Sequence, residues 1–303
     1  MNSVLILNII LHLLQSGTVQ VKSEYRYREL TDHTMVTDNG VFPFVAAILF
    51  KSVYISAGAL INEFWVITAA DSLYLVREST RVMRVRLGSV NNKKGGQLHP
   101  VKTIEIHPNF DDNKPQFDIA LVLLPRRVRF TPTLSPIKLQ MFPKKAAATH
   151  FLVNSWPPHI PSSVYPNHTE SLDNVKRRRM MTVSHLHPSS QVNCSDVYQY
   201  MNLSAGTSML CLDPALGTDP CERDVGAPVV LNGVLWGILS SWKSEDCDVD
   251  PSPILVTLVS ARNISSWIYT TTREQRRNFT RTDKAQVEYE DYYYDEDDDI
   301  NNY

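Results

Sequence analysis

Short runs of β-forming residues, each bounded by turn residues, recur from residue 41 onward at a spacing of about ten residues. This spacing is typical of an all-β sandwich or barrel. After a buried strand over 42–50, residues 52–56 and 58–62 are expected to form a hairpin partner and its continuation. One late helix is expected over 260–276, with Trp267 and Ile268 on one face. The other clear runs are 82–87, 101–106, 119–124, 229–240 and 254–259.

The chain begins with an apolar run, residues 4–14, which is shorter than the roughly 20 residues that span a bilayer. A small and polar exit, Gln15-Ser16-Gly17, follows it. This pattern predicts a secretory signal peptide over 1–17, with a membrane anchor as the alternative. No later stretch is long enough to cross a membrane, so we expect a secreted, extracellular protein with an N-terminal extension over 18–40.

Glycosylation signals and cysteines fit an oxidising compartment. The sequence holds five Asn-x-Ser/Thr acceptors, at Asn167, Asn193, Asn202, Asn263 and Asn278. All four cysteines follow residue 190, and an even number in a secreted chain predicts two bridges with three possible pairings. Zinc ligation is the weaker alternative, because no Cys-x-x-Cys pair exists. We expect no metal and no cofactor.

Charge is distributed unevenly along the chain. The formal net charge is −2, but residues 288–300 hold eight acidic side chains and no basic one. Without them, 24 acidic residues face 30 basic ones, a net charge near +6. We expect residues 273–303 to form an acidic, disordered tail. Its tyrosines among acids are candidates for sulfation, and the tail either binds a basic partner or folds back on the basic body. These tyrosines are Tyr289, Tyr292, Tyr293 and Tyr294.

Three segments carry a specific resemblance. Residues 58–72 read Gly-Ala-Leu-Ile-Asn-Glu-Phe-Trp-Val-Ile-Thr-Ala-Ala-Asp-Ser, residues 117–122 read Phe-Asp-Ile-Ala-Leu-Val, and residues 221–230 read Cys-Glu-Arg-Asp-Val-Gly-Ala-Pro-Val-Val. Together with Ser241-Trp242 and Trp267-Ile268, they resemble the trypsin-like serine proteases in the family's order. The resemblance covers about residues 40–270 and implies two six-stranded antiparallel β-barrels with a C-terminal helix. We assign the peptidase domain to 41–272.

The resemblance implies a damaged catalytic centre. The family uses a histidine base, an orienting aspartate and a serine nucleophile as one unit, and the matching positions are Asp71, Asp118 and Val225. Valine has no oxygen to attack a carbonyl. Arg223 replaces a glycine that donates to the oxyanion. We therefore expect no enzyme activity, with a new Asp71–Asp118 acid dyad as the alternative.

The resemblance also implies an altered substrate pocket. Asp219 matches the residue that selects Lys and Arg in trypsin, while Lys243 and Ile254 replace two wall glycines. Their side chains would narrow or fill the pocket. Lys243 could also neutralise Asp219, so a blocked pocket is favoured over basic specificity.

The cysteine pattern fits the same frame. One family disulfide is lost at both ends, where Ser56 and Ser72 stand. The four cysteines match two other family bridges, which implies the pairs Cys194–Cys211 and Cys221–Cys247.

Three further features can be compared with the family: the activation cleavage site, a His-Pro turn and a basic loop. No Ile-Val-Gly-Gly-like start follows a basic residue between 20 and 45, so Asp224 is expected to be held by groups other than a new amine, such as Arg223. His107-Pro108 matches a structural turn of the family. Residues 176–179, Lys-Arg-Arg-Arg, fit a processing site, a polyanion contact or a solvated loop between the barrels.

The sequence thus predicts a secreted, catalytically inactive serine protease homologue that acts by protein binding. The resemblance implies a cofactor, decoy or scaffold in an extracellular protease network, immune or reproductive. Its partner would be an extracellular protein such as an active serine protease or that protease's substrate, with no nucleic acid. The alternatives are an active serine-type hydrolase with an atypical site and a polyanion-binding secreted protein.

Overall fold

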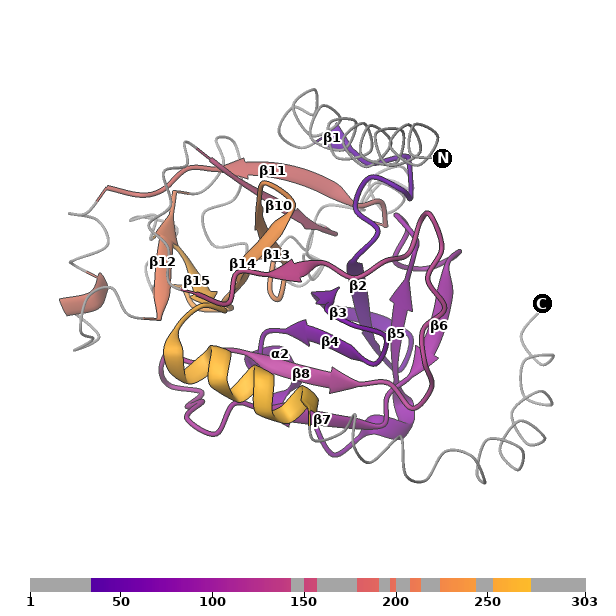
Figure 1. The fold of residues 1–303 in the computed structure, drawn as a ribbon, viewed down its shortest axis with the longest axis horizontal. Coiled ribbons are helices and arrows are strands. Elements are labelled where there is room, and N and C mark those ends of the chain that lie inside the picture. The colour runs from indigo at the N-terminus through magenta and orange to yellow at the C-terminus, as the bar shows by residue number, and fades with distance from the viewer. Residues whose placement is uncertain are drawn as a thin grey trace, which may run out of the picture.

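The computed structural model describes residues 34–142, 150–156, 179–190, 197–199, 208–213, 224–243 and 253–273. Within them the chain forms two curled sheets in which all pairings but one are antiparallel (Figure 1). The first sheet has seven strands, in the order β6 (Gln97–Pro100), β5 (Met83–Leu87), β2 (Val45–Phe50), β3 (Val53–Leu60), β4 (Trp65–Thr68), β8 (Ala120–Leu123) and β7 (Thr103–Ile106).

The second sheet has eight strands within the same ranges. Two of these, β1 and β9, are only two residues long, and β9 makes the parallel pairing with β14. Residues 34–40, expected in the N-terminal extension, therefore contribute a strand to the domain. The order is β1 (Thr34–Met35), β11 (Thr182–Leu186), β10 (Phe151–Ser155), β13 (Pro228–Leu231), β14 (Val234–Leu239), β15 (Ile254–Leu258) and β12 (Met209–Leu212), with β9 (Lys138–Leu139) beside β14.

The strands bury alternate residues, as half-buried strands should. On β5, Met83, Val85 and Leu87 point into the core of the first sheet, and the arginines between them face outward. A further core lies between the sheets, where Trp65 and Ile67 of the first meet Val183 and Ile238 of the second. This shared core fixes the two sheets against each other, and the cleft described below lies at their junction.

Few residues are helical. The short helix α2 (Asp71–Tyr74) follows β4, and the 3₁₀ turn η1 (Thr80–Val82) precedes β5. Residues 262–273 form the late helix, close to the expected 260–276, and bury Ile264 and Ile268 against the shared core. In the described part of the chain, no helix has the length and hydrophobicity needed for a membrane span.

The expected all-β fold with a late helix is confirmed, with one difference in strand boundaries. The run 229–240 is a hairpin rather than one strand, because Asn232 (φ 52°) and Gly233 (φ 71°) form a turn between β13 and β14. The runs 52–56 and 58–62 form one strand, β3, which pairs with β2 as the expected hairpin partner and its continuation. The signal-peptide region and all but the first residue of the acidic tail lie outside the described residues.

Candidate active-site cleft

Asp118, directly before β8, is the most completely bonded side chain of the site. It is 1% exposed and accepts hydrogen bonds on both carboxylate oxygens. The Asp71 backbone N–H donates to Oδ1 at 2.9 Å, and Ser240 Oγ donates to Oδ2 at 2.7 Å. The Ser241 N–H and hydroxyl also donate to Oδ2, at 3.0 and 3.3 Å. Such a set of donors compensates a buried charge, so Asp118 ties the first sheet to the segment after β14.

Asp71 begins α2, and its side chain is exposed toward the cleft. Desolvation raises the pKa of its carboxyl, Asp118 and Asp112 raise it further, and a hydrogen bond from Ser241 opposes them. The hydrogen bond between Asp71 and Asp118 uses the Asp71 backbone, whereas an acid dyad needs two carboxyls that share a proton. The geometry therefore gives no support to the dyad.

Val225 is half-buried and packs against the core between the sheets. Its carbonyl oxygen accepts hydrogen bonds from the Ala57 N–H and the Ser56 hydroxyl, both at 3.0 Å. Gly226 follows with φ 76°, and a Cβ there would overlap the Ala57 carbonyl and the Ser56 hydroxyl. The backbone of this loop therefore depends on glycine at position 226, although the residue at position 225 is an apolar valine.

Ser56 and Ser72, the two positions where the resemblance implies that a family disulfide is missing, have different surroundings. Ser56 is buried, and its hydroxyl contacts the Thr68 hydroxyl at 3.0 Å as well as the Val225 carbonyl. Ser72 makes one long hydrogen bond to the Ala69 carbonyl at 3.5 Å. Only the Ser56 end has become part of a polar network.

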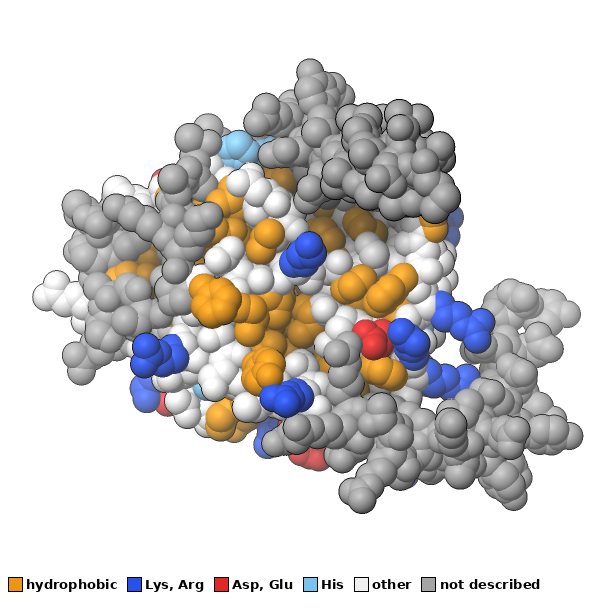
Figure 2. Space-filling view, in the orientation of Figure 1, with side chains coloured by type: hydrophobic (Ala, Val, Ile, Leu, Met, Phe, Trp, Pro, Cys, Tyr) orange, Lys and Arg blue, Asp and Glu red, His pale blue; other side chains and the backbone are white. Residues whose placement is uncertain are grey.

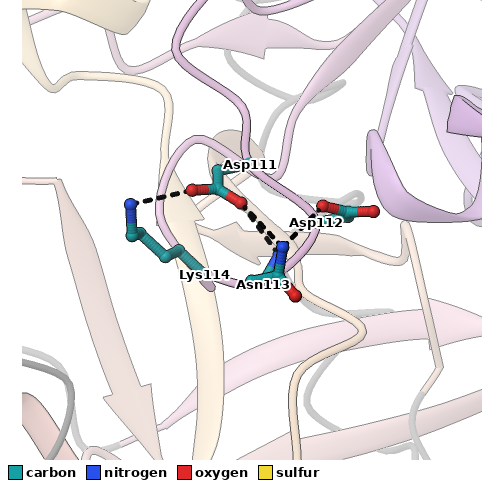
Figure 3. A network of polar contacts seen from close by, with 4 residues as sticks. All are labelled: Asp111, Asp112, Asn113 and Lys114. Atoms are coloured by element: carbon teal, nitrogen blue, oxygen red, sulfur yellow. Dashed lines mark hydrogen bonds and ion pairs between the residues drawn. The ribbon is translucent and has the colours of Figure 1, made fainter.

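A cleft of about 170 Å³ lies over Asp118. One wall is the segment 110–115, where Asn113 Nδ2 donates to Asp112 Oδ1 at 3.0 Å and Lys114 Nζ lies 2.8 Å from Asp111 Oδ2 (Figure 3). Sequence reasoning missed this wall, because its residues match no catalytic pattern. The lining residues are Asp71, Phe110, Asp112, Asn113, Lys114, Pro115, Asp118, Ser240, Ser241, Trp242 and Lys243. Val225 is not among them.

The remaining pocket positions are only partly visible. Lys243 lies in the cleft wall and is exposed. Ile254 is on β15, 8% exposed and part of the core of the second sheet, so it fills space there. Asp219 and Arg223 lie outside the described residues, and the blocked pocket remains a prediction.

Some of the other predicted residues lie within the described ranges, and the rest lie outside them. Cys211, the one cysteine in the described ranges, is disulfide-bonded, while its expected partner Cys194 lies outside them, as do Cys221 and Cys247. Asn263 is exposed at the start of the late helix. Arg179 is also exposed. Residues 176–178, the four tyrosines and the other four glycosylation acceptors lie outside the described residues; the acceptors are Asn167, Asn193, Asn202 and Asn278.

His107 has a structural setting. It is buried, its ring stacks on Phe117 at 4.8 Å between centroids, and its carbonyl accepts the Phe110 N–H. Desolvation lowers the pKa of its imidazole, and a backbone contact with Asn263 opposes this. The neutral form is thus favoured in a packed turn.

Tyr54 of β3 is a residue that sequence reasoning missed. Its ring contacts both the shared core and the core of the second sheet, and it meets Trp156 edge-on at 5.6 Å. Burial raises the pKa of its phenol well above the ordinary value, and the Asp224 carboxylate raises it further. Asp224 therefore lies within electrostatic reach of a buried tyrosine. The expected partner Arg223 is outside the described residues.

Comparison with known proteins agrees with the geometry. The family described as Trypsin matches residues 33–268. Trypsin 5G1 of Aedes aegypti is 30% identical over 62% of this chain and 66% of its own length. Kallikrein-5 of Homo sapiens is 29% identical over 68% of this chain and 64% of its own length. The chain thus spans slightly less than two thirds of these two relatives.

The solved structure of neuropsin, a serine protease expressed in the limbic system of mouse brain, has the same fold. It superimposes with a TM-score of 0.61 at 23% identity, over 78% of this chain and 98% of neuropsin.

Proposed function

This chain belongs to the trypsin family, and from the residues at its catalytic positions we propose that it is a secreted, catalytically inactive homologue that acts by binding an extracellular protein. The observation that carries the proposal is the residue at the nucleophile position. Val225 sits half-buried against the shared core and offers neither a hydroxyl nor a thiol. A base at position 71 would have nothing to deprotonate.

The surroundings of Asp118 support a retained frame without the chemistry. In a triad, the aspartate orients an imidazole through a side-chain hydrogen bond. Here the partners of Asp118 are two serine hydroxyls and two backbone N–H groups. These bonds stabilise the junction of the sheets, and none of them activates a nucleophile.

Protein binding is supported by what the family frame leaves in place. The cleft is still open, with Trp242 and Phe110 as apolar walls and charged side chains around them. Concave sites of this mixed character are typical of ligand and peptide recognition. The predicted signal peptide and glycosylation acceptors support secretion, and a role as cofactor, decoy or scaffold for an active serine protease follows from the binding hypothesis.

The first test is reaction of the purified secreted chain with a fluorophosphonate probe and with a peptide substrate library. We expect neither labelling nor turnover from folded protein, while an active trypsin run in parallel reacts with both. Turnover that is lost in Asp71→Asn but kept in Lys114→Gln would contradict the proposal and identify an atypical hydrolase.

The second test separates the binding roles. Active trypsin-family proteases are assayed on a protein substrate with and without the chain. A cofactor raises kcat/KM and a decoy lowers it, whereas no change for any protease and no complex by size-exclusion chromatography would contradict a role in a protease network. Trp242→Ala is expected to weaken an effect that uses the cleft, with exposed Tyr269→Ala on the late helix as the control.

A further inference from the structure

The segment that contains β5 and β6 is rich in basic residues. Residues 79–104 contain six Lys or Arg side chains and no Asp or Glu. On β5 the alternation of the strand places Arg84 and Arg86 outward, because Met83, Val85 and Leu87 face the core. Figure 2 shows several Lys and Arg side chains, with an acidic side chain beside them, on the side of the molecule where Figure 1 draws β5 and β6.

The arginines of this surface are oriented by backbone carbonyls. Arg86 donates from Nε to the Asn92 carbonyl at 3.2 Å and from Nη2 to the Lys93 carbonyl at 3.1 Å. Arg84 donates to the carbonyls of Met83 and Arg81 at 2.8 and 2.9 Å. Carbonyl oxygens fix a guanidinium but carry no formal charge, so these contacts leave the positive charges uncompensated.

Lysines and apolar side chains extend the same surface. Lys93 Nζ donates to the Ser52 carbonyl at 3.2 Å. Lys51 precedes Ser52 in the chain, and its backbone N–H donates to the Val82 carbonyl at 3.0 Å. Leu98 is paired directly opposite Arg86 and is 50% exposed. Val53 and Val82 are exposed as well. We name this surface the basic strip: Lys51, Val53, Val82, Arg84, Arg86, Lys93, Lys94 and Leu98.

We propose that the acidic segment 288–300 of this same chain docks on the basic strip. Its eight acidic side chains and four tyrosines match a surface that combines cations with exposed apolar groups. The tyrosine rings can cover Leu98, Val53 and Val82 while the carboxylates pair with the arginines and lysines. A sulfated glycan supplies negative charge but no apolar group, so the mixed surface favours the peptide.

The length of the intervening chain allows this docking. The late helix ends at residue 273, and residues 274–287 can span up to roughly 50 Å when extended. A tethered segment has an effective concentration in the millimolar range, so even a weak contact would be mostly occupied. The docked tail would cover the strip until an anionic partner displaced it. This inference is independent of whether the cleft is catalytic.

Peptide binding to two lengths of the chain tests the docking. The full chain is compared with a chain that ends at Asp283, which keeps every described residue. The probe is a fluorescent peptide of residues 286–303 without sulfate, followed by anisotropy. We expect the shortened chain to bind it, with affinity falling at least about tenfold between about 50 and 300 mM salt. The full chain should bind it at least about tenfold more weakly, because its own tail competes.

Matched variants of the shortened chain locate the contact. Lys93→Gln with Lys94→Gln should weaken peptide binding by about fivefold, since each exposed charge pair contributes a modest factor and the two act together. The control is Lys138→Gln with Arg262→Gln, which removes the same charge from exposed residues of β9 and the late helix. It should change binding less than about twofold.

Three results would overturn the proposal. The first is no peptide binding to the shortened chain, and the second is equal binding to both lengths. The third is an equal loss in the control pair, which would indicate attraction to net charge alone. A peptide with Tyr289, Tyr292, Tyr293 and Tyr294 replaced by Ala tests the apolar contacts. We expect weaker binding, whereas unchanged affinity together with displacement by a heparin fragment would also overturn the proposal and identify a general polyanion surface instead.

Discussion

Asp118 and Val225 stand at the positions that the resemblance matches to the family's catalytic aspartate and serine, and their surroundings differ sharply. Asp118 is buried beneath the cleft and accepts four hydrogen bonds from two segments, the start of α2 and residues 240–241. Val225 is half-buried, packs on apolar side chains and is fixed only through its backbone carbonyl. The side chain matters at the first position, whereas at the second only the path of the backbone does.

The comparison suggests why a frame can outlast its chemistry. Replacing Asp118 would leave several buried donors unsatisfied, so the fold itself requires that carboxylate. A serine nucleophile makes no such structural contribution, and valine at position 225 adds an apolar contact with the core. We infer that the fold depends more on the side chain at position 118 than on the side chain at position 225. The predictions below test this difference.

The largest effect is expected from Gly226→Ala. Its φ of 76° disfavours any side chain, and a Cβ would overlap the Ala57 backbone, which cannot move without distorting β3. We expect a loss of roughly 4 kcal/mol or failure to fold. Chemical denaturation measures it, with Gly233→Ala as the control for positive φ without a clash, since a Cβ at 233 meets nothing within 4 Å. Equal losses in both variants would show that the path beneath Val225 is not constrained by packing.

The second effect concerns Asp118. Asp118→Ala removes the acceptor of four donors and should cost about 3 kcal/mol, while Asp118→Asn keeps one carbonyl oxygen and should cost about half as much. Both values come from the free energy of unfolding in urea. A loss below about 0.5 kcal/mol in the alanine variant would mean that the bonded carboxylate has no structural role.

The two serines of the lost disulfide give a smaller, paired effect. Ser56→Ala removes the hydroxyl that contacts Val225 and Thr68 and should cost about 1–2 kcal/mol. Ser72→Ala should stay within about 0.5 kcal/mol, because its one hydrogen bond is 3.5 Å long. Melting temperatures of both variants provide the measurement. A Ser72 variant that loses as much as the Ser56 variant would contradict the assigned network.

The same residues show how far the sequence could lead. Motif order placed Asp71 and Asp118 beside each other and identified the fold, because local patterns record strand periodicity and the family's chain order. The contact between Ser56 and Val225 joins positions 169 apart in the sequence and exists only once both sheets have closed. The same holds for Tyr54 and Asp224. Such contacts depend on the packed fold, and no local pattern announces them.

The strand boundary and the cleft wall that the sequence did not predict have local causes. The expected strand 229–240 ignored the positive φ that Asn232 and Gly233 adopt, although Asn-Gly is a strong hairpin signal. The wall 110–115 was missed because its bonds link neighbouring polar side chains, as between Asp111 and Lys114. Its position over Asp118 follows from the turn at His107 and from the barrel, not from its composition.

The smallest effect is expected at Asp71, where the removed group should be slightly unfavourable. Its folded-state pKa lies above the ordinary value of 3.8, so the native state favours the neutral carboxyl. The free energy of unfolding therefore falls as pH rises from 3.8 to the folded pKa, and the full loss is present above the folded pKa. Asp71→Asn should therefore raise the free energy of unfolding at about pH 7 by roughly 0.3 kcal/mol, a small gain because the side chain is exposed to solvent.

The pH dependence of the stability difference between wild type and Asp71→Asn tests whether the charge of Asp71 causes it. The gain should shrink as pH falls through the folded pKa toward 3.8, because the wild-type carboxyl then becomes neutral too. Urea unfolding of both proteins at about pH 7 and about pH 4.5 measures the difference. An Asn variant that is less stable at pH 7 would mean that the hydrogen bond from Ser241 outweighs desolvation and the nearby carboxylates. Asp71 would then belong with Asp118 among the residues that the fold requires.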